Sequence, residues 1–277
     1  MTCEICKLNI DSKPFSFQVE GDFSWGESVN TFILENNIIS KTNWIKDGYT
    51  IVNDFFESQN EFKLFQNEVK KNIIKAIKLN DIEFDENNFK LEKYHNIVKE
   101  DFLHNNIIKF TRNLTEKDFS LDLNKLLSRA EDILNYKLST FVKELNKVHI
   151  QIRISRPNTL DINPPHKDGY LNYWKDIINI WMPISGCDKN SSLPLVPGSH
   201  LWPENQIFRT QNKGARINNF PYHVPCILKT AHGELKMIRP NPKEGEAIFF
   251  TPFLIHGAAF NVSKSTRIGM ELRFPKI

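Results

Sequence analysis

Two side chains that can bind a metal, His166 and Asp168, lie two positions apart in the stretch "PPHKDGYL". In an extended chain, residues i and i+2 point to the same side, so this imidazole and this carboxylate can face one point. The pair also fits a polar turn at the end of a strand, because an H-x-D pair often occurs by chance. A metal site therefore requires a third ligand elsewhere in the chain.

His256, in "FFTPFLIHGAAFN", is the candidate third ligand. It follows a β-rich run, and Gly257 beside it admits the close approach of a backbone or a ligand. Two histidines and one carboxylate that leave coordination positions open are diagnostic of non-haem Fe(II) oxygenases. The alternative is a core histidine that is satisfied by one hydrogen bond.

Arg267 follows His256 by eleven residues and lies in the alternating run "TRIGMELRF". A half-buried strand face is an unfavourable place for a guanidinium group, because an unpaired buried charge is costly. A cosubstrate with a carboxylate would relieve that cost through a bidentate pair. Arg273 lies six residues further on the same strand and shares its face, so it competes for this role.

The elements that must position these residues are short strands. In "VHIQIRIS" at 148–155, four apolar residues alternate with four polar ones, which predicts a strand with one apolar face. Short strands separated by Pro and Gly are typical of a β-sandwich or barrel. Further β-rich runs lie at 176–184, 193–196, 246–251 and 266–274.

The N-terminal half has a different character. Residues 1–43 show no clear pattern and are expected to be irregular, whereas 44–147 are expected to be mostly helical. We found no internal repeat and no linker, so the prediction is a single domain over 1–277, with the β-rich core at 148–277. The predicted elements of 44–147 are a short strand at 49–52 and helices at 57–79 and 118–146, with 80–117 ambiguous.

Composition is that of an ordinary soluble globular protein. The 277 residues are 40% hydrophobic, and 36 basic residues balance 33 acidic ones to a net charge of +3, which argues against a nucleic-acid binder. No apolar run approaches the roughly 18 residues that cross a membrane, and the N-terminus lacks a secretory signal. We therefore expect a cytoplasmic protein, with no membrane or nucleic-acid partner; the oligomeric state cannot be predicted.

The chain has four cysteines, too few for a disulfide framework. Cys3 and Cys6 form a C-x-x-C pair, but a zinc site needs two further ligands and the chain has no second pair. We expect two ordinary thiols.

Three stretches carry a family resemblance. They are "PPHKDGY", "INIWMPISGCDKNSSLPLVPGSH" (178–200) and "EGEAIFFTPFLIHGAAFNVSKSTR" (244–267). In this order they resemble the phytanoyl-CoA dioxygenase-like branch of the Fe(II)/2-oxoglutarate-dependent oxygenases, whose pattern is H-x-D, a V-P-G-S-H turn, and a second histidine with an arginine eleven residues later. "KDGYTIVNDFF" resembles the usual start of the family, so the resemblance spans roughly 44–275.

The resemblance implies roles for particular residues. His166, Asp168 and His256 match the iron ligands and thus the catalytic centre, and Arg267 matches the arginine that binds the distal carboxylate of 2-oxoglutarate. Gln151 and Asn179 lie on polar strand faces where relatives often place further cosubstrate contacts. The V-P-G-S-H turn is expected to be mainly structural, although its histidine, His200, could reach the substrate.

The fold implied by the resemblance is mainly β with flanking helices. It is a double-stranded β-helix, a cupin-like jelly-roll barrel with a helical N-terminal part packed on it and iron near one open end. The implied cofactors are Fe(II), 2-oxoglutarate and O2. The implied reaction is hydroxylation of an unactivated C–H bond of a small molecule, with release of succinate and CO2.

The substrate is suggested only by the segment 201–242, which we expect to form a lid-like loop over the barrel mouth. It carries six basic residues against two acidic ones, which could select an anionic small molecule; the alternative is an ordinary solvated loop. The basic residues are Arg209, Lys213, Arg216, Lys229, Lys236 and Arg239.

Two other functions remain open. One is a jelly-roll binding protein without turnover, and the other is a cupin-like metal isomerase or epimerase that does not consume 2-oxoglutarate. Arg267 argues against the binding protein, which has no need for a buried arginine at that distance from a ligand histidine.

Overall fold

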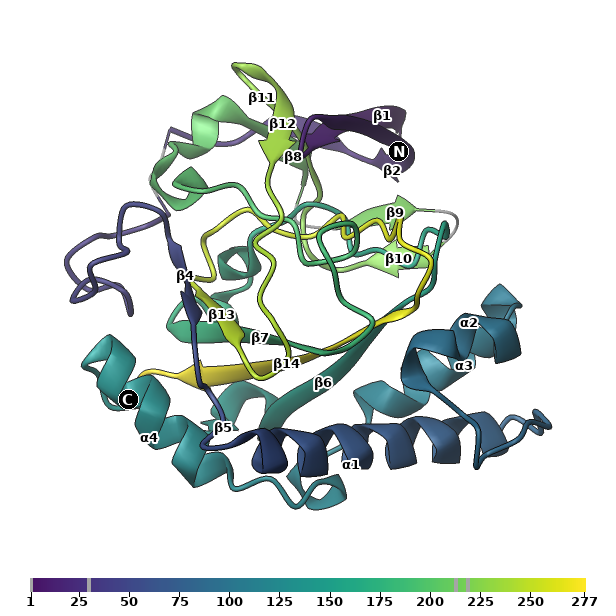
Figure 1. Cartoon of the computed structure of the whole chain (residues 1–277). Coiled ribbons are helices and arrows are strands. Elements are labelled where there is room, and N and C mark those ends of the chain that lie inside the picture. Colours follow the sequence, from purple (N-terminus) through teal and green to yellow (C-terminus); the bar gives the residue numbers. More distant parts are fainter. Residues whose placement is uncertain (1, 29–30, 212–213, 218–219) are drawn as a thin grey trace.

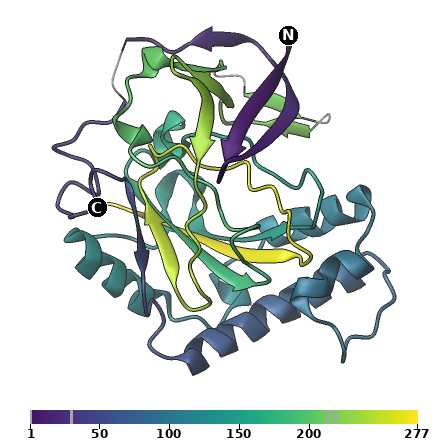
Figure 2. The same ribbon diagram turned by 45° about the horizontal axis from the view of Figure 1, so that its top comes forward.

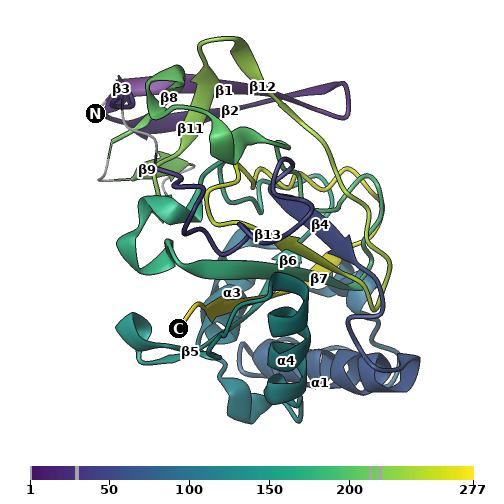
Figure 3. The same cartoon turned by 90° about the vertical axis from the view of Figure 1, so that its left-hand side faces the viewer.

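The computed structural model describes residues 2–28, 31–211, 214–217 and 220–277. In this described part, a layer of helices lies against one sheet, and a second sheet lies on the far side of the molecule (Figures 1 and 3). The predicted class, mainly β with flanking helices, is confirmed. The helices are α1 (Gln59–Lys78), α2 (Tyr94–Ile97), α3 (Asp101–Arg112) and α4 (Leu123–Leu134). The strands are β1 (Thr2–Ile10), β2 (Lys13–Gly21), β3 (Phe23–Trp25), β4 (Tyr49–Val52), β5 (Phe141–Val142), β6 (Lys147–Ser155), β7 (Ile177–Ser185), β8 (Ile207–Thr210), β9 (Ala215–Ile217), β10 (Phe220–Tyr222), β11 (Ile227–Thr230), β12 (Gly233–Met237), β13 (Ala247–Phe250) and β14 (Arg267–Pro275).

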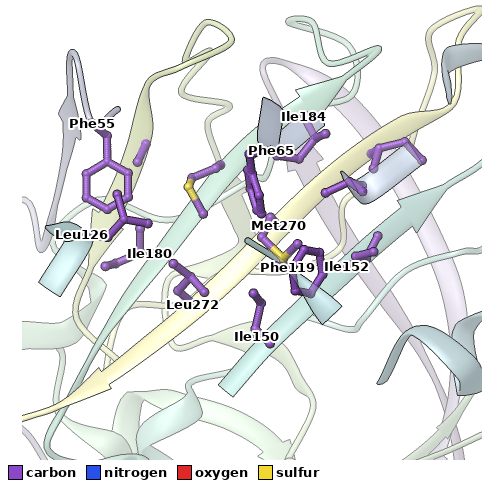
Figure 4. Close-up of a cluster of buried hydrophobic side chains, with 14 of the residues drawn as sticks. Phe55, Phe65, Phe119, Leu126, Ile150, Ile152, Ile180, Ile184, Met270 and Leu272 are labelled. Atoms are coloured by element: carbon purple, nitrogen blue, oxygen red, sulfur yellow. The ribbon is translucent and has the colours of Figure 1, made fainter. Parts of the chain in front are cut away.

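The six-stranded sheet is antiparallel, with the order β4-β13-β7-β14-β6-β5. Its strands alternate, so one face is apolar and packs on the helices. Figure 4 shows side chains of this core, among them Ile150, Ile152, Ile180, Met270 and Leu272 from the sheet. Each such side chain contributes roughly 1.5–3 kcal/mol when it is fully buried. The opposite face points into the barrel and carries the candidate site.

Short bridges close the barrel over that inner face. His166 pairs with His256, His256 pairs with Leu195, and Leu195 pairs with Ile238. The eight-stranded sheet, in the order β10-β9-β2-β1-β12-β11-β8-β3, lies beyond them, as Figure 2 shows from above. The jelly-roll character therefore rests on one long sheet and a facing layer of bridges, which holds both candidate histidines.

Of the two predicted helices, one forms as expected and the other is shorter than expected. The helix expected at 57–79 is α1, which begins after Ser58 because that side chain accepts the backbone N–H of Glu61 at 3.1 Å. The helix expected at 118–146 is only α4. It ends at Asn135, which adopts a left-handed conformation with φ 54°, and the chain then enters β5. Within the ambiguous segment the structure forms α3.

Two expectations about irregular segments are wrong. The segment 1–43 contains a long hairpin, β1 and β2, whose turn residues Asp11 and Ser12 both have positive φ. The expected lid at 201–242 is not a loop, because it contains β8 to β12 and supplies strands to the eight-stranded sheet. Both segments build that sheet together, since β1 pairs in parallel with β12. No helix among the described residues is both long and apolar enough to cross a bilayer.

The V-P-G-S-H turn joins the N-terminal segment to the barrel. His200 is fully buried, and its Nε2 donates to the carbonyl oxygen of Ile45 at 2.8 Å. Its ring also lies where a Cβ on Gly48 would be, 2.5 Å from Nδ1, which explains the glycine of "KDGY". The backbone N–H of Gly198 donates to Asp47. These contacts give the turn the structural role expected of it.

Candidate metal centre

His166 and His256 are placed side by side by their own backbones. The N–H of each donates to the carbonyl oxygen of the other, at 3.0 and 3.1 Å, and the two rings lie 4.3 Å apart. Gly257 makes this approach possible: its φ is 113°, and a Cβ there would meet the carbonyl oxygen of Pro164 at 2.5 Å. The glycine next to His256 therefore serves the close backbone approach that its position predicts.

Both rings direct their Nε2 atom toward Asp168. Nδ1 of His166 donates to the carbonyl oxygen of Pro164 at 2.7 Å, and Nδ1 of His256 donates to that of Leu254 at 3.0 Å. Since a carbonyl can only accept, the neutral form of each ring has its proton on Nδ1 and its lone pair on Nε2. Ligand atoms of the two histidines and Asp168 lie within 4.8 Å of one another, and all three residues are buried. This donor set fits a divalent metal such as Fe(II).

The electrostatics of the centre favour the protonation states that a metal needs. Burial lowers the pKa of His256 to about 4, so the ring is neutral at pH 7. Burial raises the pKa of Asp168, but the nearby Arg273 guanidinium, together with His256 and His166, brings the pKa below its usual value. Neutral imidazole and ionised carboxylate are the forms that coordinate a cation.

The two competing arginines of β14 have different surroundings. Arg267 is buried, and its Nε and Nη1 have no hydrogen-bond partner among the described residues. Its guanidinium lies 5.8 Å from the ring of Trp181, and burial lowers its pKa to about 10. Arg273 instead donates to Asp168 at 3.0 Å and pairs with Glu271. Only Arg267 is therefore available to an incoming carboxylate.

Gln151 and Asn179 both lie on the inner face of the sheet. Gln151 pairs with Glu271 across β6 and β14 and is half-buried. Asn179 is fully buried, and its Nδ2 donates to Asp168 Oδ2 at 2.9 Å. The structure thus gives Asn179 a contact with a metal ligand, which the sequence did not suggest. A contact of either residue with the cosubstrate stays a prediction.

The rest of the barrel interior divides into an apolar and a charged wall. The apolar wall contains Trp181, Leu193, Leu195, Ile248, Phe250, Leu254 and Ala259. The charged wall was missed by sequence reasoning: Arg153 bonds Glu271 through Nε at 2.8 Å, and Glu271 pairs in turn with Arg273. Its sequence signal was the polar half of the alternating strand 148–155, which holds Arg153.

Lys167, between the two ligands of H-x-D, points to a different partner. It is fully buried, and its Nζ lies 2.8 Å from Oε1 of Glu204. The other oxygen of Glu204, Oε2, accepts from the hydroxyl of Tyr170. This buried pair anchors the segment after the V-P-G-S-H turn beside the H-x-D segment. Lys167 thus faces Glu204 rather than the histidines.

The basic residues of 201–242 that the structure describes do not gather at one place. Arg209 lies over the ring of Tyr170 and near Glu204, and Arg239 donates to the carbonyl oxygen of Phe260. Three others lie on strands of the eight-stranded sheet: Arg216 on β9, Lys229 on β11 and Lys236 on β12. Lys213 lies outside the described residues.

His166, Asp168 and His256 form the one group of metal-binding side chains found in the described part of the chain. Cys3 is exposed and Cys6 is buried. Three residues apart on β1, they point to opposite faces of the sheet. The C-x-x-C pair therefore cannot bind one ion in this strand.

Comparison with known proteins agrees with the motifs. The family model described as Phytanoyl-CoA dioxygenase (PhyH) matches residues 44–269. No curated protein matches the sequence. Among solved structures, the non-heme alpha ketoglutarate dependent epimerase SnoN from nogalamycin biosynthesis is 12% identical, with a TM-score of 0.45 over 87% of this chain and 81% of that one. The carbocyclase SnoK is 12% identical, with a TM-score of 0.47 over 90% and 87%. EctD from S. alaskensis, solved with 2-oxoglutarate and 5-hydroxyectoine, is 14% identical, with a TM-score of 0.48 over 93% and 83%. Similarity of this size concerns the course of the chain and not the reaction.

Proposed function

The chain belongs to the phytanoyl-CoA dioxygenase family of non-haem Fe(II)- and 2-oxoglutarate-dependent enzymes, and we propose that it hydroxylates an unactivated C–H bond of a small molecule. Fe(II), 2-oxoglutarate and O2 are the cofactor and cosubstrates of this family. The observation that carries the proposal is the combination of two features: a buried His166–Asp168–His256 set, and a buried arginine, Arg267, two of whose nitrogens have no partner among the described residues.

His166, Asp168 and His256 would hold the iron through two Nε2 atoms and a carboxylate oxygen. When bound, the metal supplies the oxidising chemistry that couples decarboxylation of 2-oxoglutarate, to succinate and CO2, to oxygen insertion. The chain contributes ligand orientation, because each imidazole is held through Nδ1 by a backbone carbonyl.

Arg267 would bind the distal carboxylate of 2-oxoglutarate. Its Nε and Nη1 have no partner among the described residues, and a guanidinium can bind a carboxylate through two parallel hydrogen bonds. Trp181 and its apolar neighbours would pack against the methylene groups of the cosubstrate and exclude water. Gln151 and the free Oδ1 of Asn179 stay candidates for further polar contacts.

We propose an anionic substrate, and the charge of the interior supports this. The barrel interior carries three guanidinium groups, of Arg153, Arg267 and Arg273, and two carboxylates, of Asp168 and Glu271; Arg153 and Arg273 pair with these carboxylates. Fe(II) and the 2-oxoglutarate dianion would cancel each other, so one positive charge is left in the interior. An anion would balance it, whereas a cation would be repelled.

We also propose that the protein works in the cytoplasm. All four cysteines are free thiols in the structure, as expected in a reducing compartment.

The test is succinate formation in the presence of Fe(II), ascorbate and 2-oxoglutarate. We expect slow uncoupled turnover in the wild type and its loss in His166→Ala. In Arg267→Ala the KM for 2-oxoglutarate should rise. Binding of 2-oxoglutarate to the Co(II)-loaded protein is the second readout. Absence of both succinate and 2-oxoglutarate binding would contradict the proposal. It would leave the isomerase and the non-catalytic binding protein as alternatives.

A further inference from the structure

Asp168 receives a buried hydrogen-bond donor on each of its two oxygens. Arg273 Nη2 donates to Oδ1 at 3.0 Å, and Asn179 Nδ2 donates to Oδ2 at 2.9 Å. The same two oxygens face the two histidines, with Nε2 of His166 3.5 Å from Oδ1 and Nε2 of His256 3.5 Å from Oδ2. Both donors are buried. The plane of the carboxylate is therefore fixed from two sides.

The sheet holds these two donors at a set separation. Arg273 on β14 and Asn179 on β7 are directly paired, so their side chains leave the same face as neighbours. Asp168 lies on a separate segment, because it begins the short 3-10 turn Asp168–Tyr170. Two groups from the sheet thus hold a carboxylate that belongs to another segment.

Arg273 is itself immobilised. Its guanidinium lies 4.3 Å from the ring of Trp174, and Nη2 also pairs with Glu271, which is bonded in turn by Arg153. Glu271 balances the charge of Arg273. The guanidinium can therefore donate to Asp168 without placing an uncompensated positive charge beside a metal cation.

We propose that Arg273 and Asn179 are positioning residues that hold Asp168 in the orientation required for metal binding, with Glu271 holding Arg273. The inference rests on the proposed metal site, but it makes a separate claim about residues that are not ligands. Hydrogen-bond partners of metal ligands typically change metal affinity by roughly 10–100-fold when they are removed.

The experiment is a Co(II) titration of the metal-free full-length protein, followed by the visible d–d absorption. For Asn179→Ala and Arg273→Lys we expect the Kd for Co(II) to rise by roughly 10–100-fold, with changed band positions because the ligand geometry changes. The matched control is Asn72→Ala. It also removes a buried amide, but Asn72 bonds the backbone of Glu68 and Asp118. This control should lower thermal stability and leave Kd and spectrum unchanged.

The outcomes separate the two proposals. If wild type binds Co(II) in a way that His166→Ala abolishes, while Asn179→Ala keeps the wild-type Kd and spectrum, the positioning role is overturned and the metal site stands. If wild type shows no such binding, the metal site itself fails. Asn179→Ala decides the matter even if Arg273→Lys does not fold, because Asn179 carries no charge whose partner would be left unpaired.

Discussion

Replacing Arg267 by Met should stabilise the protein in the absence of cosubstrate. The guanidinium is only 4% exposed, and two of its nitrogens lack a partner among the described residues. Burial lowers its pKa from 12.5 to about 10. That difference corresponds to about 3 kcal/mol of unfavourable free energy for the charged form at neutral pH. Met has a similar length and no charge, so the melting temperature should rise by about 2–6 °C, even after some contacts are lost.

The same substitution should remove most of the affinity for 2-oxoglutarate. Truncating one partner of a buried, hydrogen-bonded charge pair costs about 2–5 kcal/mol, which corresponds to a 30- to 5,000-fold increase in Kd. The melting temperature without cosubstrate should thus rise while the affinity for 2-oxoglutarate falls. The reason is that the buried charge of Arg267 destabilises the free protein and attracts the cosubstrate.

The assay is thermal unfolding of the Co(II)-loaded protein with and without saturating 2-oxoglutarate, together with calorimetric titration. Arg273→Met is the matched control, since Arg273 lies on the same strand but is already paired with two carboxylates. It should lower the melting temperature, because it leaves buried charges unpaired. The reasoning is refuted if Arg267→Met destabilises the protein as Arg273→Met does and leaves 2-oxoglutarate binding intact.

Three further predictions concern stability. Burial lowers the pKa of His104 to about 4. Between pH 6.5 and pH 4, this histidine is therefore protonated in the unfolded chain and neutral in the folded chain. Stability should fall by up to about 3 kcal/mol between pH 6.5 and 4, and His104→Gln should flatten melting temperature against pH in that window. Gly257→Ala should cost about 1–3 kcal/mol and weaken Co(II) binding, because its Cβ would meet Pro164; unchanged melting and binding would contradict this. Lys167→Met should cost about 3 kcal/mol, the low end for a broken buried pair, because other donors still contact Glu204. Adding Glu204→Gln should restore part of the lost free energy of unfolding, measured with denaturant. If the two substitutions lower this free energy additively, the pairing is contradicted.

The strands of the barrel could be predicted because their patterns are local. The run 148–155 alternates strictly, and β6 occupies 147–155 with its apolar residues toward the helices. The N-terminal hairpin was missed although it carries a similar signal, since Cys6, Leu8 and Ile10 alternate in burial on β1. That signal is short, and the rest of the strand is exposed. The assignment of the whole chain to one domain stays a prediction.

The elements that went wrong depend on contacts distant in sequence. The apolar residues of 118–146 continue at helical spacing beyond α4, but Leu138 pairs with Lys276 and Phe141 pairs with Val148. Pairing with the last residues of the chain at Leu138, and with β6 at Phe141, overrides the local helical preference there. The expected lid became strands for the same reason, because its partners include β1 at the opposite end of the chain.

The candidate site shows the same limit at the level of single residues. Spacing from His256 singled out Arg267, but spacing alone could not separate it from Arg273, which shares its strand face. The difference arises from their neighbours: Arg273 lies opposite Asn179 and within reach of Asp168 and Glu271, whereas two nitrogens of Arg267 have no partner in the described chain.

The two arginines therefore divide the tasks that a carboxylate-binding barrel requires. The arginine next to the metal ligands, Arg273, already pairs with two carboxylates, so it orients Asp168 and is not the group that binds the cosubstrate. The arginine at the other end of β14, Arg267, has two nitrogens without a partner in the described chain and lies near an apolar cluster, where a low dielectric strengthens its attraction for an incoming carboxylate. If Arg273 were the arginine that binds the cosubstrate, the carboxylate of 2-oxoglutarate would compete with Asp168 for its guanidinium. The order of charges along β14 keeps ligand orientation and cosubstrate binding separate.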